Sequence, residues 1–82
     1  SIVIDKTDVR IRRHLASFIP ARMAELNITE ADIARATGDS PSQINRAVRG
    51  QNTPSLAFGL RLADALQCSL DELCGHNVAV NS

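Results

Sequence analysis

The segment S-P-S-Q-I-N-R-A-V-R-G, residues 40–50, has the signals of a short and well-capped helix. Ser40 and Gln43 form the S-x-x-Q pattern of a capping box, in which each side chain satisfies a free backbone N–H at the helix start. Pro41 stands at the first helical position, where its missing N–H costs nothing. Gly50 can end the helix. The segment therefore predicts a helix over residues 41–49.

This predicted helix has one apolar side and one polar side. On a wheel of about 100° per residue, the apolar side consists of Ile44, Ala47 and Val48. The opposite side carries Ser42, Arg46 and Arg49, flanked by Gln43 and Asn45. A solvated helix face usually mixes both charge signs, whereas this one carries arginine and amides without an acid. The polar side is therefore a candidate binding surface for a negatively charged partner.

Further helix starts surround this segment. Thr29, followed by two early acids, predicts a helix over residues 30–37 that Gly38 can end. Downstream, Thr53-Pro54 predicts a helix that runs to about Gln67, and a capping box at residues 69–72 predicts a last helix to about Cys74. Four helix starts in fewer than fifty residues predict a compact all-α domain.

The N-terminal part also has a helical pattern. Apolar residues recur at three- and four-residue steps between residues 8 and 26, namely Ile11, Leu15, Phe18, Ile19, Met23 and Leu26. Pro20 interrupts the pattern at a cost of about 3 kcal/mol, so we expect two helices or one kinked helix, broken near residues 18–20. The β-branched runs at residues 2–4 and 78–80 could form short terminal strands.

Composition restricts the function classes. The chain of 82 residues allows one small domain, and its nine basic and nine acidic residues give no net charge. Seven arginines nevertheless fall in two stretches without acids, residues 9–24 and 40–63, so one face can still be basic. Arg10, Arg12 and Arg13 could form a solvated face of an N-terminal helix, or belong to an arm or helix that contacts phosphate or the minor groove. With no signal-peptide pattern and no apolar run of about 20 residues, we expect a cytoplasmic protein with no membrane partner.

Catalysis and metal binding have little support in the sequence. No carboxylate pair, nucleophile set or glycine-rich phosphate loop stands out, so we expect no enzyme and no cofactor. Cys68, Cys74 and His76 match no common zinc spacing, and the two cysteines are expected to be reduced thiols. His14 is expected to be exposed or bonded locally.

The helix over residues 30–37, the turn at Gly38 and the helix over residues 41–49 form the order of a helix-turn-helix unit. In such units the second helix lies in a DNA major groove. Its polar side chains suit the base edges there, because Arg binds guanine, Gln or Asn binds adenine, and Ser can bind either.

Three stretches strengthen this interpretation: I-T-E-A-D-I-A-R-A-T-G-D-S-P-S-Q-I-N-R-A-V-R-G (28–50), N-T-P-S-L (52–56) and L-A-D-A-L-Q-C-S-L-D-E-L (62–73). Together they resemble the Cro/xenobiotic-response-element family of helix-turn-helix proteins, which includes phage repressors. The resemblance implies a compact five-helix, lambda-repressor-like domain over residues 19–75. An N-terminal extension (1–18) and a C-terminal tail (76–82) would flank it.

The resemblance also implies roles for single residues. The positions matching the family's DNA-contacting residues are Pro41, Ser42, Gln43, Asn45, Arg46, Arg49, Gln51 and Asn52. Pro41, Ser42, Gln43 and Arg46 would lie at bases, Arg49 near the backbone, and the loop 51–53 near phosphate. The implied core residues are Ile33, Ala34, Ile44, Leu56, Leu60, Ala63, Leu66, Leu70 and Leu73.

Some residues depart from the family pattern. Glu30 stands where many relatives have glutamine, and phosphate would repel it unless it turns away or accepts from a cytosine amino group. Thr37 and Asp39 replace residues that are often apolar, which predicts a turn that is wetter, that is, more exposed to water, than usual. Pro41 can offer only an apolar contact, for instance to a thymine methyl.

A last departure concerns the helix after Pro54. Ala57 and Phe58 occupy positions that are often polar, so this helix is apolar nearly all round and should be buried on more than one side. Either the segment before Pro20 or a second subunit would cover it. We favour a dimer interface formed by this helix and the two chain ends.

The sequence therefore predicts a regulator of transcription, a repressor by preference, that binds a palindromic duplex operator as a homodimer. One alternative is an antitoxin whose ends, residues 1–5 or 78–82, bind a toxin. Another is a protein-interaction module that has lost its affinity for DNA, an alternative suggested by the zero net charge.

Overall fold

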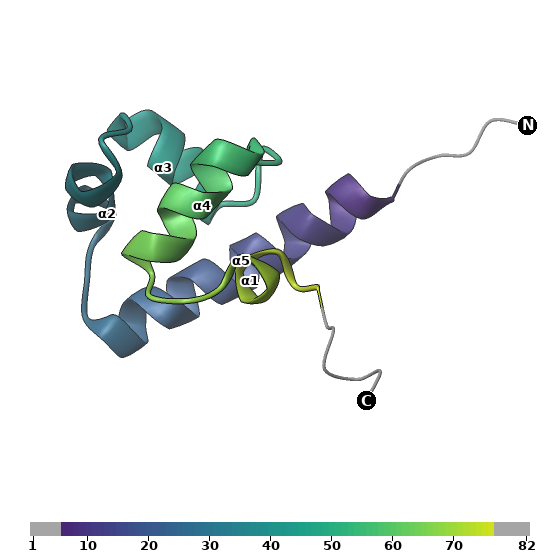
Figure 1. Ribbon diagram of the computed structural model, residues 1–82, viewed down its shortest axis with the longest axis horizontal. Helices are drawn as coiled ribbons and strands as arrows, with labels where there is room; N and C mark the ends of the chain where they lie inside the picture. Colours follow the sequence, from purple (N-terminus) through teal and green to yellow (C-terminus); the bar gives the residue numbers. More distant parts are fainter. Residues whose placement is uncertain (1–5, 77–82) are drawn as a thin grey trace, which may run out of the picture.

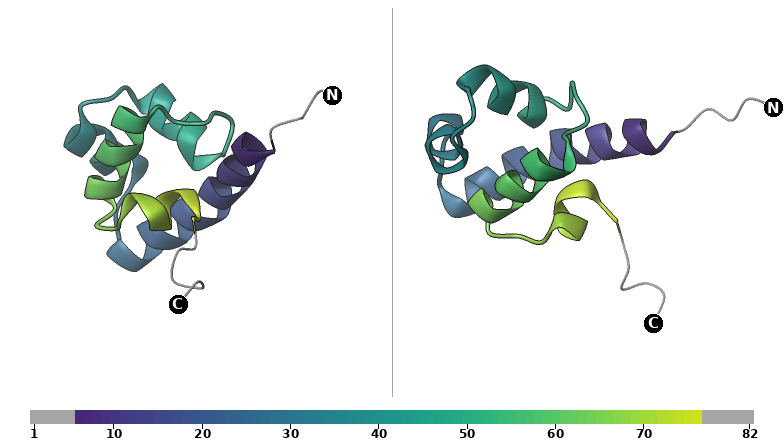
Figure 2. Two further views of the ribbon diagram at one scale, coloured as in Figure 1. Left: turned by 45° about the vertical axis from the view of Figure 1, so that its right-hand side comes forward. Right: turned by 45° about the horizontal axis from the view of Figure 1, so that its top comes forward.

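The computed structural model describes residues 6–76, which form five α-helices and no strand (Figure 1). The helices are α1 (Thr7–Leu26), α2 (Glu30–Thr37), α3 (Pro41–Val48), α4 (Leu56–Ala65) and α5 (Leu70–Cys74). Helix α1 is the longest, and its N-terminal end extends beyond the other helices in Figures 1 and 2. The predicted all-α fold is confirmed, and the possible terminal strands lie outside the described residues. None of the described helices is long and apolar enough to cross a membrane.

Helix α1 is a single helix that contains Pro20, so of the two expected arrangements the one with two separate helices is wrong. Pro20 is exposed, and the helix continues because Leu15 and Ile19 on its other side are fully buried. Burying two such side chains contributes about 1.5–3 kcal/mol each, which offsets the cost of about 3 kcal/mol for the proline. Leu15 belongs to the predicted N-terminal extension, yet it lies in the same core as the other helices.

Local capping explains where three of the helices begin. Helices α2, α3 and α5 start at complete capping boxes, Thr29 with Asp32, Ser40 with Gln43, and Ser69 with Glu72. In each box the hydroxyl accepts from a backbone N–H three residues on, and the longer side chain accepts from the N–H of the capping residue. The predicted starts of these helices are confirmed.

The predicted start and end of α4 are both wrong. Ser55, not Thr53, caps this helix, because the Ser55 hydroxyl accepts from the backbone N–H of Phe58 at 3.2 Å. The Thr53 hydroxyl instead accepts from Arg12 Nη1 at 3.4 Å, a contact to α1. The helix ends at Ala65 rather than near Gln67, which has a φ of 54°.

The core lies where all five helices meet. Its ten buried apolar side chains are Leu15, Ile19, Ile33, Ala34, Ile44, Ala47, Leu62, Ala63, Leu66 and Leu73. Two core predictions are wrong, because Leu56 is 68% exposed and Leu60 is 48% exposed, and Leu70 is only partly buried. Helix α4 turns Gly59, Leu62 and Ala63 inward instead.

Gly59 helps to determine which side of α4 faces the core. A Cβ on Gly59 would lie 3.3 Å from Leu70 Cδ1, so the helix approaches α5 closely along its glycine side. Helix α4 packs against α2 and α5, and these neighbours leave Leu56 and Leu60 at the surface.

His14 joins the two ends of the described chain. Its Nε2 donates to the Glu72 carbonyl oxygen at 2.7 Å, and its ring stacks on Phe18 with centroids 5.2 Å apart. Gly75, at a φ of 77°, packs against the ring so closely that a Cβ there would lie 2.8 Å from His14 Cγ. The prediction of an exposed or locally bonded His14 is wrong, because α5 folds back onto α1 and supplies the acceptor.

Candidate nucleic-acid interface

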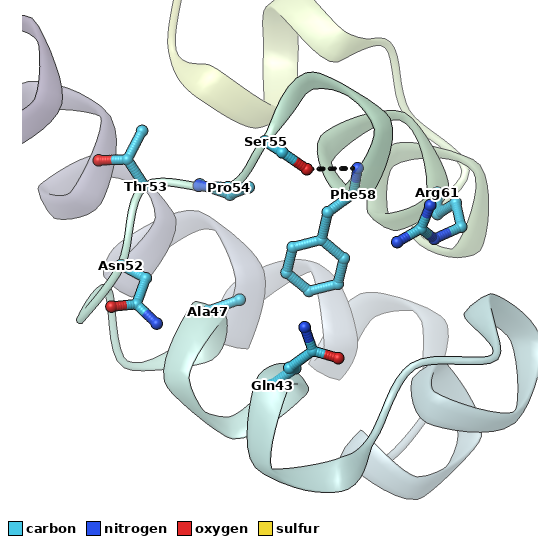
Figure 3. Close-up of a pocket in the computed structure, with 8 residues that line it drawn as sticks. All are labelled: Gln43, Ala47, Asn52, Thr53, Pro54, Ser55, Phe58 and Arg61. Carbon is cyan, nitrogen blue, oxygen red and sulfur yellow. Dashed lines mark hydrogen bonds between the residues drawn. The ribbon is translucent and has the colours of Figure 1, made fainter.

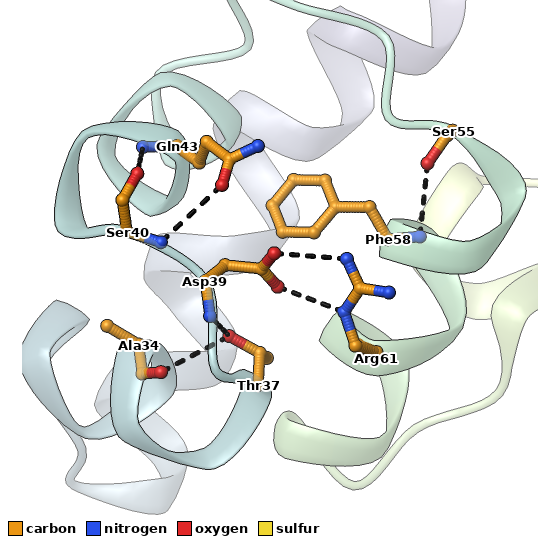
Figure 4. A network of polar contacts seen from close by, with 8 residues as sticks. All are labelled: Ala34, Thr37, Asp39, Ser40, Gln43, Ser55, Phe58 and Arg61. Atoms are coloured by element: carbon orange, nitrogen blue, oxygen red, sulfur yellow. Dashed lines mark hydrogen bonds and ion pairs between the residues drawn. The ribbon is translucent and has the colours of Figure 1, made fainter.

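The turn between α2 and α3 is held by polar contacts to protein groups. Gly38 ends α2 in the left-handed region at a φ of 78°. The Asp39 carboxylate accepts from Arg61 Nε and Nη2, each at 3.0 Å, and the Asp39 N–H donates to the Thr37 hydroxyl at 3.2 Å (Figure 4). The Asp39 side chain is only 12% exposed. The prediction of a wetter turn is therefore wrong for Asp39, whose carboxylate is turned toward α4.

The pair between Asp39 and Arg61 also changes the titration of both groups. The hydrogen bonds from Arg61 hold the pKa of Asp39 below its ordinary value, although partial desolvation acts in the other direction. The same bonds raise the pKa of Arg61. A bidentate pair of this kind fixes both side chains in one plane, which links the turn before α3 to α4.

Helix α3 has the two sides that the sequence predicts. Ile44 and Ala47 are buried and Val48 is half-buried. The outward residues are Pro41, Ser42, Gln43, Arg46 and Arg49, all of them exposed. Arg46 Nε donates to the Ser42 carbonyl oxygen at 3.4 Å, so its guanidinium group lies back along the helix. The outward face holds two cations and no anion of its own.

Two amide side chains on the flanks of this face are already engaged. Asn45 is half-buried, and its Nδ2 donates to Glu30 Oε1 at 3.1 Å and to Glu30 Oε2 at 3.5 Å. Gln43 Oε1 accepts from the Ser40 N–H at 3.4 Å. The Glu30 carboxylate is thus directed at Asn45 on α3.

The loop after α3 borders a hollow of about 400 Å³ between α3 and the start of α4 (Figure 3). Gln51 and Asn52 are exposed at this loop. The hollow is lined by Gln43, Ala47, Asn52, Thr53, Pro54, Ser55, Phe58 and Arg61. The loop is held against α1, because Gly50 lies so close to Arg12 that a Cβ would be 2.3 Å from its carbonyl oxygen. Helix α1 therefore positions the loop beside the outward face of α3.

The structure divides the arginine-rich stretches of the sequence into two groups. Arg46 and Arg49 lie on the outward face of α3, whereas Arg61 is paired with Asp39. Arg22 is directed at the end of α4, where its Nε and Nη2 donate to the Leu66 and Gln67 carbonyl oxygens at 2.9 and 2.8 Å. The distribution of charge along the sequence does not reveal this division, because Arg61 and Arg22 bond to residues that lie 22 and 45 positions away.

The two cysteines lie outside α3, Cys68 after the end of α4 and Cys74 at the end of α5. Cys68 and Cys74 are free thiols, and burial, together with the charge of Glu72, raises the pKa of Cys68. Within residues 6–76, no three His, Cys, Asp or Glu side chains are placed to hold a metal ion.

Comparison with known proteins agrees with this geometry. A family model described as helix-turn-helix matches residues 21–73, more than half of the chain. A transcriptional repressor, RstR of the cryptic phage CTXphi from Vibrio cholerae serotype O1 (strain ATCC 39315 / El Tor Inaba N16961), is 31% identical over 67 residues. That match covers 82% of this chain and 56% of the length of the relative. No solved structure matches the chain.

The matched range contains α2, the turn, α3 and α4 in full, and it includes the outward face of α3. In DNA-binding proteins with this unit, the second helix lies in the major groove. The chain belongs to the Cro/xenobiotic-response-element, phage-repressor-like family of helix-turn-helix DNA-binding proteins.

Proposed function

We propose that the protein is a transcriptional repressor that binds a specific sequence of duplex DNA with α3 in the major groove. The observation that carries this proposal is the outward face of α3, which is exposed, basic and free of acids over its whole length. A major groove is wide enough for one helix, and it surrounds the helix with acceptors and donors of the bases and with phosphate charge. The repressor named among the relatives favours repression over activation.

The exposed residues divide into two roles. Ser42 and Arg46 lie near the middle of the outward face, where side chains reach base edges, and Pro41 offers only apolar contact. Arg49 at the helix end and the exposed loop residues Gln51 and Asn52 are suited to phosphate. Gln43 and Asn45 lie on the two flanks of the face.

Two arginine variants test these roles. Arg46→Ala should change the preferred base at one position of each half-site by about 1–3 kcal/mol, because a bidentate contact to guanine is lost. Arg49→Ala should weaken binding to all duplexes alike and reduce the slope of log affinity against log salt by about one. Both are measured by selection from a random duplex library, followed by fluorescence-anisotropy titrations at several salt concentrations.

Arg35→Ala is the matched control, because Arg35 is exposed on α2 and paired with Asp32 rather than placed on α3. It removes the same charge and should leave base preference unchanged. If neither Arg46→Ala nor Arg49→Ala changes affinity for any duplex, the assignment of α3 is wrong. Binding that does not weaken with salt would favour the alternative of an interaction module without DNA affinity.

We further propose a homodimer formed through α4. Leu56 and Leu60 are four residues apart on one side of this helix, and both are exposed. Leu56 borders an apolar groove of about 250 Å³ between α1, α4 and α5, whose walls include Ile11, Leu15, Leu70 and Leu73. A second copy would cover these leucines. The two α3 helices of such a dimer would contact half-sites about 34 Å apart, which is one helical turn of DNA. The operator would be palindromic, because its symmetry mirrors the two-fold symmetry of the protein.

Leu60→Glu tests this interface, and Ala24→Glu is the matched control. Ala24 is also exposed, but it lies near the C-terminal end of α1, away from Leu56, Leu60 and the groove, so its replacement adds the same charge outside the proposed contact. Sedimentation equilibrium should show a dimer for the parent protein and Ala24→Glu and a monomer for Leu60→Glu. A parent protein that stays monomeric at the concentrations where it binds DNA contradicts the proposal. The antitoxin alternative concerns residues 1–5 and 78–82, which lie outside the described residues.

A further inference from the structure

The two flanking amides of α3 are each held by a neighbouring group, and we infer that Glu30 thereby determines which bases Asn45 can recognise. The inference rests on the proposed function, because it concerns α3 in a major groove. Asn45 and Glu30 are half-buried and lie on different helices, 15 residues apart in the sequence. On the helical wheel Asn45 is next to Arg49, at the edge of the outward face that lies toward α2.

The partner of Asn45 fixes the orientation of its amide. An ionised carboxylate can only accept hydrogen bonds, so the Asn45 group directed at Glu30 must be the amino group. The contacts of Nδ2 to Glu30 Oε1 at 3.1 Å and to Oε2 at 3.5 Å have this arrangement. The Asn45 Oδ1 atom is therefore left on the side away from Glu30. Without such a partner the amide could turn over, because its two ends have nearly the same shape.

Gln43 on the other flank is fixed in the opposite sense. Its partner is the Ser40 backbone N–H, which can only donate, so Gln43 must present Oε1 to the cap. The Gln43 amino group is then directed away from Ser40, toward the Phe58 side of the hollow (Figure 4). The flank at Asn45 thus presents an acceptor to its surroundings, and the flank at Gln43 presents a donor.

An outward Oδ1 selects among base edges in the major groove. Adenine and cytosine present amino groups there, at N6 and N4, and these can donate to the Asn45 oxygen. Guanine and thymine present oxygen atoms at the matching positions, O6 and O4, which would face another acceptor. The nearby Glu30 carboxylate adds negative charge and strengthens this discrimination. Glu30 is therefore a positioning residue that makes this flank of α3 select an amino-bearing base.

The test compares four proteins by selection from a random duplex library, followed by competition titrations. The parent protein should prefer adenine or cytosine at one position of each half-site, and Asn45→Ala should lose that preference by about fivefold, the value of one hydrogen bond. Glu30→Gln should reduce the preference at the same position, because glutamine can accept from or donate to Asn45. Other positions should keep their preferences, and overall affinity should not fall, because a negative charge near phosphate is removed.

The double variant Glu30→Gln with Asn45→Asp is the matched rescue. It moves the carboxylate from α2 to α3 while it keeps the net charge of the parent protein. The new carboxylate on α3 would be acceptor-only and held by the amino group of the new glutamine on α2, so the preference for an amino-bearing base should return. Failure of this exchange to restore the preference would contradict the proposal that the acceptor at position 45 selects the base.

A second measurement concerns the free protein. The side-chain amide resonances of Asn45 should shift in Glu30→Gln, while the melting temperature shows whether that variant remains folded. Unchanged resonances would overturn the inference, as would a base preference that Asn45→Ala abolishes and Glu30→Gln leaves intact. A uniform loss of affinity at all positions in Glu30→Gln would also overturn it. If the parent protein selects no sequence at all, it is the proposed function that fails.

Discussion

The two sides of this small domain are held together by different kinds of interaction. Around α2, α3 and α4, the contacts between helices include directional polar pairs, Asp39 with Arg61 and Glu30 with Asn45. Where α1, α4 and α5 meet, fully buried leucines such as Leu15, Leu62 and Leu73 form the contact, and the side chains of His14 and Arg22 bond only to backbone carbonyl oxygens across it. Apolar burial contributes most of the stability, whereas directional bonds fix the orientation of side chains near the proposed DNA contact. The following predictions separate these two contributions.

The largest effect is expected in the apolar core. Leu62→Ala should lower the free energy of unfolding by about 2–5 kcal/mol, because Leu62 is fully buried and its loss leaves a cavity. Leu60→Ala, two residues earlier on the same helix, should cost less than about 1 kcal/mol, because Leu60 is 48% exposed. Urea unfolding at concentrations where the protein is monomeric measures both. Equal losses would show that α4 has a different register.

A smaller effect is expected at the junction of α3 with α1. Gly50→Ala should destabilise the fold by more than about 2 kcal/mol, because φ is 68° and the new Cβ would lie 2.3 Å from the Arg12 carbonyl oxygen. Gly38→Ala is the control, since φ is 78° but no atom lies within 4 Å of the new Cβ. It should show only the backbone cost of about 1–2 kcal/mol. Thermal unfolding compares the two, and similar losses would contradict the close contact with α1.

The smallest effect is expected for the polar pair, and it depends on pH. Arg61 lowers the pKa of Asp39 in the folded protein, so the pair stabilises the fold above the unfolded-state pKa of about 4. This contribution is lost as the pH falls through the lowered pKa of the folded state. Asp39→Asn should therefore be less stable than the parent protein at pH 7, and the difference should shrink toward pH 2.

Asp64→Asn is the control for that experiment, because Asp64 is exposed on α4 and its replacement removes a charge from the same helix as Arg61. Urea unfolding from pH 7 to pH 2 follows the three proteins. If the free energies of unfolding of Asp39→Asn and the parent protein differ by the same amount from pH 7 to pH 2, the ion pair does not contribute to stability.

Sequence reasoning succeeded where the signal is local. The capping boxes at Thr29, Ser40 and Ser69 lie within four residues each, and all three helix starts were correct. The apolar side of α3 was also correct, because the period of a helix determines which residues share a face. At the start of α4, two nearby hydroxyl residues can each cap a helix, and the contact from Arg12 to Thr53 left Ser55 as the cap.

The sequence by itself determined the all-α fold, the helix-turn-helix unit and the outward basic face of α3, because these depend on residues within one or two helical turns. Only the tertiary structure decided which polar groups are paired between different helices and turns. Asn45 meets Glu30 across 15 residues, Arg61 meets Asp39 across 22, and His14 meets Glu72 across 58. Hydrogen bonds act over about 3 Å and in set directions, so their partners are known only when the helices have packed.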